Sequence, residues 1–283
     1  MSDNAARILA GLFESRTGQK LAPGRQWRID TALRPLIQAR GFSSAEAFVL
    51  AIVNGRDKAL ADAAVEAMLN NETFFFRDHG AFRLLDEVAL ERLRAARTAK
   101  AVRRLRIWCA GCSTGQEAYT LAMLIGSQPT RWAGWTVEIL GTDVSGAAIA
   151  QARQGIYSQM EIQRGLPVQQ MMRWFEPDGE RWRAQATLRR AVTFRTHNLI
   201  EAAPAPVGYD LVLCRNVLLY FGSDVRRLVF GRLAGAIAPD GVLMLGAGET
   251  VIGNTDDFVS DYESRGFYRL RLDRAAGALA QGR

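Results

Sequence analysis

The residues with the clearest potential for chemistry form a glycine-rich turn, Ala-Gly-Cys-Ser-Thr-Gly, at positions 110–115. A strand predicted over residues 105–109 runs into this turn, and a helix is predicted directly after it. Glycines let a ligand approach the backbone, and in open α/β sheets the ligand crevice lies at the carboxyl ends of strands. The next predicted strand ends in Gly-Thr-Asp at 141–143. The Asp143 carboxylate there can accept hydrogen bonds from both hydroxyls of a ribose. Together with Gly111, it indicates a nucleoside ligand.

The charge at the start of the following helix favours a cationic nucleoside. A dinucleotide site uses G-x-G-x-x-G to seat a pyrophosphate on a helix N-terminus. Here the turn is G-x-x-x-G, and Glu117 follows it. A carboxylate would repel phosphate, whereas it suits the sulfonium and amino groups of S-adenosylmethionine. Glu117 equally fits a residue that only complements the helix dipole, so both interpretations remain open here.

The same turn contains a C-x-x-C pair, Cys109 and Cys112, which raises the question of a zinc or redox site. Zinc needs four ligands, and only Cys214 and one of His79 or His197 remain to complete the set. Cys109 falls inside the predicted strand, where a small buried hydrophobe is the simpler interpretation. We therefore predict no metal and assign no redox role.

Composition excludes several broad classes of protein. The chain has 283 residues, of which 48% are hydrophobic and 23% are charged, as in globular proteins. No apolar run reaches the roughly 18 residues of a spanning helix, and the N-terminus lacks the pattern of a secretory signal. Three cysteines argue against a disulfide scaffold and for the cytoplasm. The net charge of +7 allows an acidic partner without choosing one.

A basic run between Arg92 and Arg106 holds seven positive charges and no acid. Charge runs are commonly solvated faces, and cations suit the C-terminal end of a helix. We interpret this run as a helix end with a linker, and a binding patch is the alternative.

Hydrophobic periodicity predicts helices alone for the first hundred residues and alternating strands and helices afterwards. Five early helices are expected. The first is capped by Asp3-Asn4, and the second covers residues 26–39. The third begins at Ser43, with Glu46 completing a capping box, the fourth begins at Asp57, and the fifth covers residues 79–97. The strands are expected at 105–109, 136–141, 192–196, 210–214, 242–246 and 266–272, with helices at 116–125, 146–154 and 224–237. This is the pattern of a parallel, doubly wound α/β sheet.

Residues from about 157 to 190 interrupt the alternation, and the turn signal Pro177-Asp178-Gly179 predicts a hairpin there. The predicted organisation is a helical N-terminal domain at 1–90, a basic helix end and linker at 91–104, and an α/β domain at 105–283 that carries an inserted β-subdomain at 157–190.

Four motifs carry a resemblance to a known family. The run Asn71-Glu-Thr-Phe-Phe-Phe-Arg-Asp78 resembles the N-x-T-x-F-F-R-[DE] signature of the chemotaxis protein-glutamate O-methyltransferases, the CheR type. Residues 108–119 are similar to their donor loop, 140–145 to their acidic strand tip, and 209–221 to their fourth-strand motif. The resemblance covers the whole chain in order. It implies a class I S-adenosylmethionine methyltransferase, Rossmann-like, with a helical N-terminal domain and an inserted β-subdomain.

The resemblance assigns roles to residues that match these motifs. The implied donor-binding residues are Asn71, Thr73, Arg77, Gly111, Glu117, Asp143, Asn198, Leu199, Arg215 and Asn216. Arg77 is expected to orient the incoming carboxylate, and Tyr220 to direct its hydroxyl to the same place, which makes both catalytic candidates. The family usually has a G-H-S-E turn after the fifth strand, whereas this chain has Gly-Ala-Gly-Glu at 246–249, so only Glu249 is retained.

The implied reaction is methylation of glutamate side chains in the cytoplasmic helical bundle of transmembrane chemoreceptors. A glutamate has a pKa of about 4.3, so it arrives ionised and needs no general base, which agrees with the scarcity of histidine. Basic residues of the second helix are expected to dock the acidic bundle. These are Arg25, Arg28, Arg34 and Arg40.

Several alternatives remain open at this point. One is a methyltransferase of the same fold that acts on a small molecule or nucleic acid, and another is a non-catalytic adaptor that binds the donor or its product. Against nucleic acid, the basic run lacks the interleaved aromatic residues of a stacking surface. The hairpin at 175–180 is short, so we expect no tether for a receptor tail peptide. Separately, we expect no direct membrane insertion and a monomeric protein.

Overall fold

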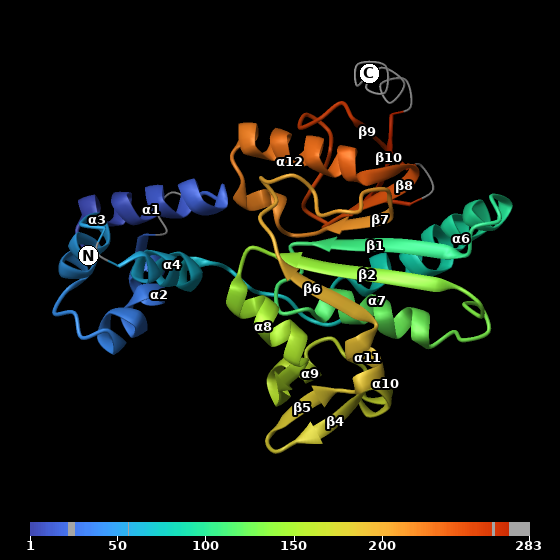
Figure 1. Cartoon of the computed structure of the whole chain (residues 1–283), viewed down its shortest axis with the longest axis horizontal. Helices are drawn as coiled ribbons and strands as arrows, with labels where there is room; N and C mark the ends of the chain where they lie inside the picture. Colours follow the sequence, from blue (N-terminus) through green and yellow to red (C-terminus); the bar gives the residue numbers. More distant parts are fainter. Residues whose placement is uncertain (22–25, 56, 262–263, 272–283) are drawn as a thin grey trace. The chain divides into compact units, whose positions relative to one another are not determined.

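The computed structural model describes residues 1–21, 26–55, 57–261 and 264–271 (Figure 1). The chain forms two units, one of Met1–Asn70 with Leu219–Val225 and one of Asn71–Leu218 with Arg226–Arg283. The first unit therefore ends before residue 90, where the domain boundary was expected. Phe75, Leu85 and Leu93 belong to the core of the larger unit, which draws in both the end of the predicted helical domain and the predicted linker.

The smaller unit is a helical cluster around one apolar core, which includes Leu9, Phe13, Leu33 and Phe48. Each helix contributes one apolar face, as helical spacing predicts. Its helices are α1 (Asp3–Thr17), α2 (Gln26–Ala39), α3 (Ala45–Val53) and α4 (Lys58–Met68).

Two of the expected helix caps are wrong. α1 is capped by Ser2, whose side chain accepts from the Ala5 N–H, because Asp3 is already helical. α3 is capped by Ser44 rather than Ser43. Glu46 closes no capping box there, since it accepts a hydrogen bond from the Ser2 N–H at 2.8 Å. Asp57 caps α4 as predicted.

The larger unit is built on a seven-stranded sheet of order β6-β2-β1-β7-β8-β10-β9. Five strands are parallel, but β10 pairs antiparallel with β8 and β9 antiparallel with β10, so the sheet is mixed rather than wholly parallel. β9 was not predicted, because three residues carry too little periodicity. The strands are β1 (Arg104–Ala110), β2 (Thr136–Asp143), β6 (Val192–Thr196), β7 (Tyr209–Cys214), β8 (Ile237–Leu245), β9 (Phe258–Ser260) and β10 (Phe267–Leu270).

Helices cover both faces of this sheet, which confirms the doubly wound α/β class (Figure 1). α7 (Gln116–Gly126) and α8 (Gly146–Gln154) lie on one face, and α12 (Ser223–Ala236) lies on the other. The strand order reverses between β1 and β7, which are neighbours in the sheet but distant in sequence. A ligand crevice is therefore expected at the carboxyl ends of these two strands.

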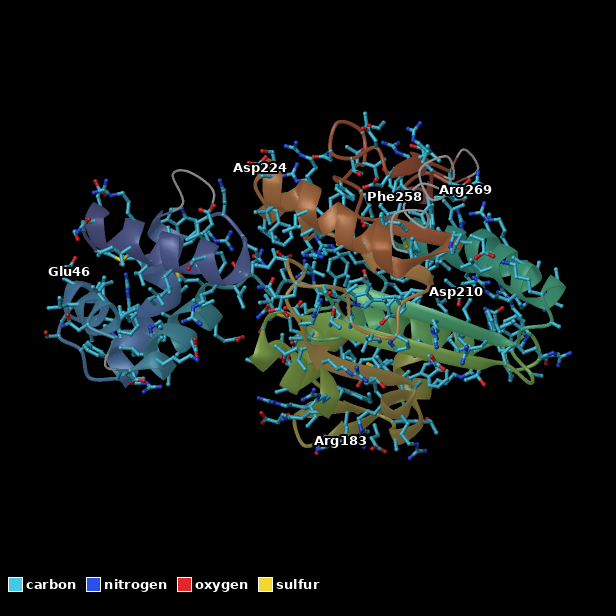
Figure 2. The ribbon with its side chains drawn as sticks, turned by 45° about the horizontal axis from the view of Figure 1, so that its top comes forward. Glu46, Arg183, Asp210, Asp224, Phe258 and Arg269 are labelled. Atoms are coloured by element: carbon cyan, nitrogen blue, oxygen red, sulfur yellow. The ribbon has the colours of Figure 1, made fainter. Side chains whose placement is uncertain are left out.

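A continuous helical rod leads towards β1 and carries the first three residues of the basic run, Arg92, Arg94 and Arg97. It consists of α5 (His79–Leu84), a π-helical turn η1 (Leu85–Ala89) and α6 (Leu90–Ala99). Arg97 pairs with Asp210 at the start of β7 and with Asp240, which also binds Lys100. Asp210, marked in Figure 2, is 4% exposed and accepts from the Arg106 N–H at 2.7 Å. Arg97 thus ties the rod to the sheet and is not part of a solvated face, whereas Arg103 and Arg104 of the same run are exposed, as the solvated interpretation expects.

The inserted subdomain contains a three-stranded sheet of order β3-β5-β4. The expected hairpin is present, but its turn is Gly179-Glu180, since Asp178 pairs with Arg181 across the strands. β3 was not predicted. The elements are β3 (Ile156–Ser158), α9 (Gln159–Gln163), α10 (Val168–Trp174), β4 (Phe175–Asp178), β5 (Arg181–Ala184) and α11 (Ala186–Arg190). Within the described ranges, no helix combines the length and the apolar character needed to cross a bilayer.

Candidate functional site: a donor crevice at the ends of β1 and β7

The glycine-rich turn after β1 is compact and depends on its glycines. The N–H groups of Gly111 and Cys112 both donate to the Thr142 carbonyl at 2.8 Å, which folds the turn back onto β2. Gly111 has φ +82°, and a Cβ there would lie 2.5 Å from Val217 Cγ2. Only glycine fits, so the turn after β1 can lie close to the turn after β7.

Asp143 holds the turn in place from the neighbouring strand. Its Oδ2 accepts from the Ser113 N–H at 2.8 Å, and its Oδ1 accepts from the Ser145 N–H at 2.9 Å. The carboxylate therefore joins the turns after β1 and β2. A carboxylate has about four acceptor positions, so these two bonds are compatible with further bonds to a ribose. The predicted role of Asp143 towards the ribose stays a prediction.

Arg215, directly after β7, sits at the centre of a charged cluster. Its side chain is 1% exposed and pairs with Glu117 at 2.8 Å and with Asp78 at 2.5 Å. Its Nη2 also donates to the main-chain carbonyl of Arg77 at 3.1 Å. Three elements far apart in sequence, the Asn71–Asp78 segment, the start of α7 and the end of β7, thus meet at one guanidinium. Because an unpaired buried charge is strongly destabilising, removing either carboxylate should lower the stability of the folded protein.

Glu117 provides the negative charge that a cationic ligand would need. Its side chain is 12% exposed, and burial raises the pKa of its carboxyl group, although Arg215 opposes this by favouring the charged form. Arg77 acts on the same carboxyl in the same sense as Arg215, more weakly. The predicted donor-binding residues Glu117, Arg77 and Arg215 are therefore neighbours in space.

Two buried polar atoms at this site have no hydrogen-bond partner among the described residues, Arg215 Nε and Asn216 Oδ1. Unsatisfied buried polar atoms are rare and call for an explanation. Asn216 also has φ +60°, in a left-handed region that is uncommon outside glycine and that recurs at functional sites. These features, with the Glu117 carboxylate and the close-packed glycine turn, fit a polar, cationic nucleoside such as S-adenosylmethionine.

Glu249 supports this site in a way that the sequence did not reveal. Its Oε2 accepts from the N–H groups of Asn216 at 2.7 Å and Gly246 at 2.9 Å. Its Oε1 accepts from Val217 at 2.9 Å and Leu218 at 2.7 Å. One carboxylate therefore satisfies four backbone donors and joins the turns after β7 and β8. Its retention in the otherwise altered Gly-Ala-Gly-Glu turn was the only available signal.

The Asn71–Asp78 segment is fastened along its length to the larger unit. The main-chain oxygen of Asn71 accepts from Ser113 Oγ at 2.7 Å, and its Nδ2 donates to Ser145 Oγ at 3.3 Å. Phe76 N donates to Thr120 Oγ1 at 3.1 Å. Phe76 and Asp78 have φ values of +53° and +62°. The segment thus keeps an unfavourable backbone beside the crevice, as functional segments often do.

The other residues predicted to bind the donor belong to the same unit. Thr73 is half-buried within the segment. Asn198 and Leu199 follow β6, where Leu199 is buried and Asn198 Oδ1 accepts weakly from the Ile200 N–H at 3.4 Å. Their contacts with the donor stay predictions.

The three cysteines are free and buried. Burial raises the pKa of the thiols of Cys109, Cys112 and Cys214, which favours the neutral thiol over the reactive thiolate. Among the described residues, no cluster of histidine, cysteine, aspartate or glutamate side chains could hold a metal ion.

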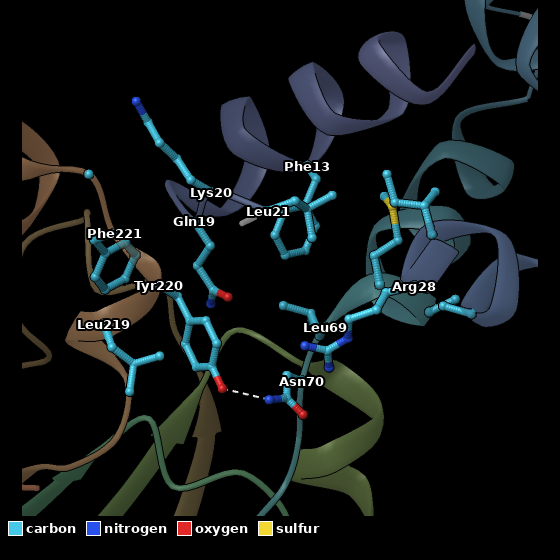
Figure 3. A pocket seen from close by; sticks show the side chains of 15 residues that line it. Phe13, Gln19, Lys20, Leu21, Arg28, Leu69, Asn70, Leu219, Tyr220 and Phe221 are labelled. Atoms are coloured by element: carbon cyan, nitrogen blue, oxygen red, sulfur yellow. Dashed lines mark hydrogen bonds between the residues drawn. The ribbon is translucent and has the colours of Figure 1, made fainter. Parts of the chain in front are cut away.

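The smaller unit contains a pocket of about 570 Å³ that two predicted residues share. Arg28 of α2 and Tyr220 of η2 (Leu218–Tyr220) both line it, with apolar walls that include Phe13 and Leu69 (Figure 3). Asn70 Nδ2 donates to the Tyr220 hydroxyl at 2.5 Å, and Lys20 N donates to the Tyr220 carbonyl at 2.7 Å. A cation and a phenol hydroxyl therefore face one cavity.

Two further residues of the predicted docking surface do not line this pocket. Arg34 and Arg40 are exposed on and after α2. Arg25 lies outside the described residues.

Comparison with known proteins agrees with this geometry. Residues 71–265 match the family described as CheR methyltransferase, SAM binding domain. The chain is 34% identical over 261 residues to chemotaxis protein methyltransferase 1 of Vibrio cholerae, covering 91% of this chain and 93% of that protein. It is 34% identical to chemotaxis protein methyltransferase 1 of Pseudomonas aeruginosa, covering 87% and 90%.

A more distant relative is the chemotaxis protein methyltransferase of Salmonella typhimurium, 29% identical over 97% of this chain and 93% of that protein. Among solved structures, a TehB-like SAM-dependent methyltransferase from Corynebacterium glutamicum aligns at 18% identity with a TM-score of 0.33, over 59% of this chain and 69% of that one. On the family match and the curated relatives, the chain belongs to the CheR methyltransferase family and is an S-adenosylmethionine-dependent methyltransferase of chemotaxis.

Proposed function

We propose that this enzyme methylates glutamate side chains of the cytoplasmic helical bundle of chemoreceptors, in the cytoplasm, and yields glutamate 5-O-methyl esters. The observation that carries the proposal is the state of Arg77. Its Nη1 donates only to the main-chain oxygen of Glu72, at 3.2 Å, and no carboxylate of the described residues lies within ion-pair distance of it. A guanidinium with no carboxylate of the described residues within ion-pair distance, next to a donor crevice, suits an incoming carboxylate.

The reaction asks little acid–base chemistry of the protein. When bound, S-adenosylmethionine supplies a methyl group on a sulfonium, which an anionic oxygen can attack in line. A glutamate is ionised at neutral pH, so no side chain has to remove a proton. Glu117 would hold the cationic end of the donor, and Asn216 and Arg215 would contact its polar atoms. The work of the chain is then orientation and exclusion of water.

Two assays test the proposal together. Calorimetry should show binding of S-adenosylmethionine and none of NAD. Receptor-containing membranes incubated with the enzyme and methyl-labelled donor should release volatile label on treatment with alkali, because carboxyl esters hydrolyse under these conditions. Label that survives alkali would instead indicate methylation of nitrogen or nucleic acid, and donor binding without any label would indicate an adaptor.

Arg77 and Tyr220 are the proposed catalytic residues. We expect Arg77→Ala to lower kcat by at least about tenfold, because a positioned charge that orients the nucleophile is lost. Tyr220→Phe should lower kcat less, since it removes one hydroxyl and keeps the ring in the pocket. Initial rates with receptor membranes, read against donor affinity from calorimetry, separate catalysis from binding. Unchanged turnover in both variants would remove them from the catalytic site.

Docking is proposed to use the basic residues of α2. Arg34 is exposed, and charge reversal by Arg34→Glu should raise KM for receptor several-fold, with a larger effect at low salt because exposed charges are screened at high salt. Arg7→Glu changes an exposed arginine of α1 in the same unit and is the matched control. Methylation kinetics that do not depend on salt, or equal effects of both reversals, would contradict docking by α2.

A further inference from the structure

The inserted subdomain reaches the Asn71–Asp78 segment through Arg164. This residue directly follows α9, and its Nη2 donates to Glu72 Oε1 at 2.7 Å. Its guanidinium carbon lies 4.5 Å from the centre of the Phe74 ring, within the range of a cation–π contact. The side chains of Arg164 and Glu72 are 51% and 54% exposed, so the ion pair itself adds little to folding stability.

Arg77 shares the two neighbours of Arg164. Its Nη1 binds the main-chain oxygen of Glu72 at 3.2 Å, and its guanidinium carbon lies 5.5 Å from the centre of the Phe74 ring. Two guanidinium groups thus border the same glutamate and the same ring. Of these two guanidinium groups, that of Arg164 binds the carboxylate, and that of Arg77 binds the main chain.

The backbone keeps this arrangement in place. Gly165 has φ +84°, and a Cβ there would overlap the carbonyl oxygen of Phe75. The Phe75 ring is fully buried and packs edge-on against Tyr157 of β3 at 5.2 Å and Phe175 of β4 at 5.4 Å. The position of Arg164 relative to Glu72 is therefore set by close packing, not by the exposed ion pair.

We propose that Arg164 is a positioning residue, which holds the Glu72 carboxylate away from Arg77 so that the Arg77 guanidinium stays available to an incoming carboxylate. If Arg164 is removed, the Arg77 guanidinium still borders Glu72 and can bind its carboxylate. A carboxylate tethered within reach competes at a high effective concentration with any carboxylate from solution. The inference rests on the proposed function in one respect, namely that Arg77 receives the substrate glutamate.

Three variants test this positioning role: Arg164→Ala, Glu72→Gln and the double variant. Arg164→Ala should raise KM for receptor by on the order of tenfold, since it lets Glu72 occupy Arg77. Donor affinity by calorimetry and the melting temperature should change little. Glu72→Gln alone should stay close to wild type, and adding it to Arg164→Ala should restore KM. Arg164→Lys, which keeps the charge, should retain most of the activity.

The matched control is Arg173→Ala, which removes another arginine of the same subdomain that lies over an aromatic ring, Trp174, at 5.0 Å. It should leave KM for receptor unchanged. A receptor-independent readout is the rate at which phenylglyoxal modifies Arg77, followed by mass spectrometry. This rate should fall several-fold in Arg164→Ala and recover in the double variant, because an ion pair protects the guanidinium.

The outcomes separate the two proposals. If the Arg77 modification rate follows this pattern but no receptor is methylated, the positioning role holds and the proposed substrate is wrong. If Arg164→Ala matches wild type in both readouts, or the double variant is as impaired as Arg164→Ala, the positioning role is overturned. A loss of melting temperature in Arg164→Ala that accounts for the kinetic loss and persists in the double variant would likewise overturn it in favour of a structural role.

Discussion

Replacing Glu117 with glutamine is expected to weaken binding of S-adenosylmethionine by roughly 100-fold, equivalent to about 2.7 kcal/mol. The carboxylate is 12% exposed and is the charge at the start of α7 that can face a sulfonium or ammonium group. Glutamine keeps the shape of the side chain and removes the charge. In a site with little water, a lost charge interaction weakens binding far more than it would at the surface. Calorimetric titration with the donor measures the effect.

A control is needed because Glu117→Gln also takes one partner from Arg215, which is 1% exposed. Asp78→Asn removes the charge of the other partner, which is 39% exposed. Both variants should lower the melting temperature, since each leaves the buried arginine with one carboxylate. Only Glu117→Gln should cause the large loss of donor affinity. Equal losses in the two variants would mean that Glu117 acts only through Arg215.

Protonation of Glu117 is expected to make donor binding depend on pH. Burial raises the pKa of Glu117, so in the protein without donor this carboxyl is protonated at a higher pH than an ordinary glutamate, whose pKa is about 4.3. Affinity for the cationic donor should be highest above the raised pKa and should fall as the pH drops through it. Glu117→Gln should abolish this dependence, because no proton is then taken up. A pH profile that is the same in both proteins would assign the titration to another group.

The second large effect is expected at Glu249. Its two oxygens accept from four backbone N–H groups, of which Asn216 and Val217 follow β7 and Gly246 follows β8. Glu249→Ala leaves these donors without their acceptor and should lower the free energy of unfolding by about 3 kcal/mol. Asn216 should then lose its φ of +60°, and methyl transfer should fall by more than about tenfold. Denaturant unfolding and initial rates measure the two losses.

Glu249→Gln makes this prediction sharper. A glutamine offers one carbonyl oxygen, and its NH₂ group would point at backbone N–H donors, so donor would face donor. The conservative substitution should therefore be nearly as damaging as alanine. Glu180→Gln, an exposed glutamate in the hairpin turn, provides the matched control and should have no effect. A fully active Glu249→Gln would show that the bonds to this carboxylate do not position the turn.

Features set by neighbours in the chain could be predicted, and features set by distant contacts could not. Gly111 and Glu117 were found because strand, turn and helix follow one another within a few residues. The charge on Arg97 was misread as solvated, since its partners Asp210 and Asp240 lie far along the chain. The role of Glu249 was missed for the same reason. The N–H groups of Asn216 and Val217, from which it accepts hydrogen bonds, lie more than thirty positions away in the sequence.

Predicted helix and unit boundaries were wrong where two candidate positions fit the local sequence equally well. Ser43 and Ser44 are equally good caps by type, and the backbone of Ser44 decides, with φ −156° and ψ +164°. The end of the smaller unit was misplaced because residues 79–97 carry a strong helical pattern, and periodicity alone cannot tell which core a helix joins. Leu85 and Leu93 reveal this only through their packing.

The burial of Phe75 between Tyr157 and Phe175 has a consequence for how this family can vary. The ring belongs to the Asn71–Asp78 segment by sequence but to the core of the inserted subdomain by packing. The subdomain is therefore not an interchangeable module. Grafting an inserted subdomain of different size from another relative would leave the Phe75 ring overpacked or facing a void. It would also displace Arg77, which follows Phe75 by two residues. A change in the size of the insertion must then be matched by a change in the Asn71–Asp78 segment.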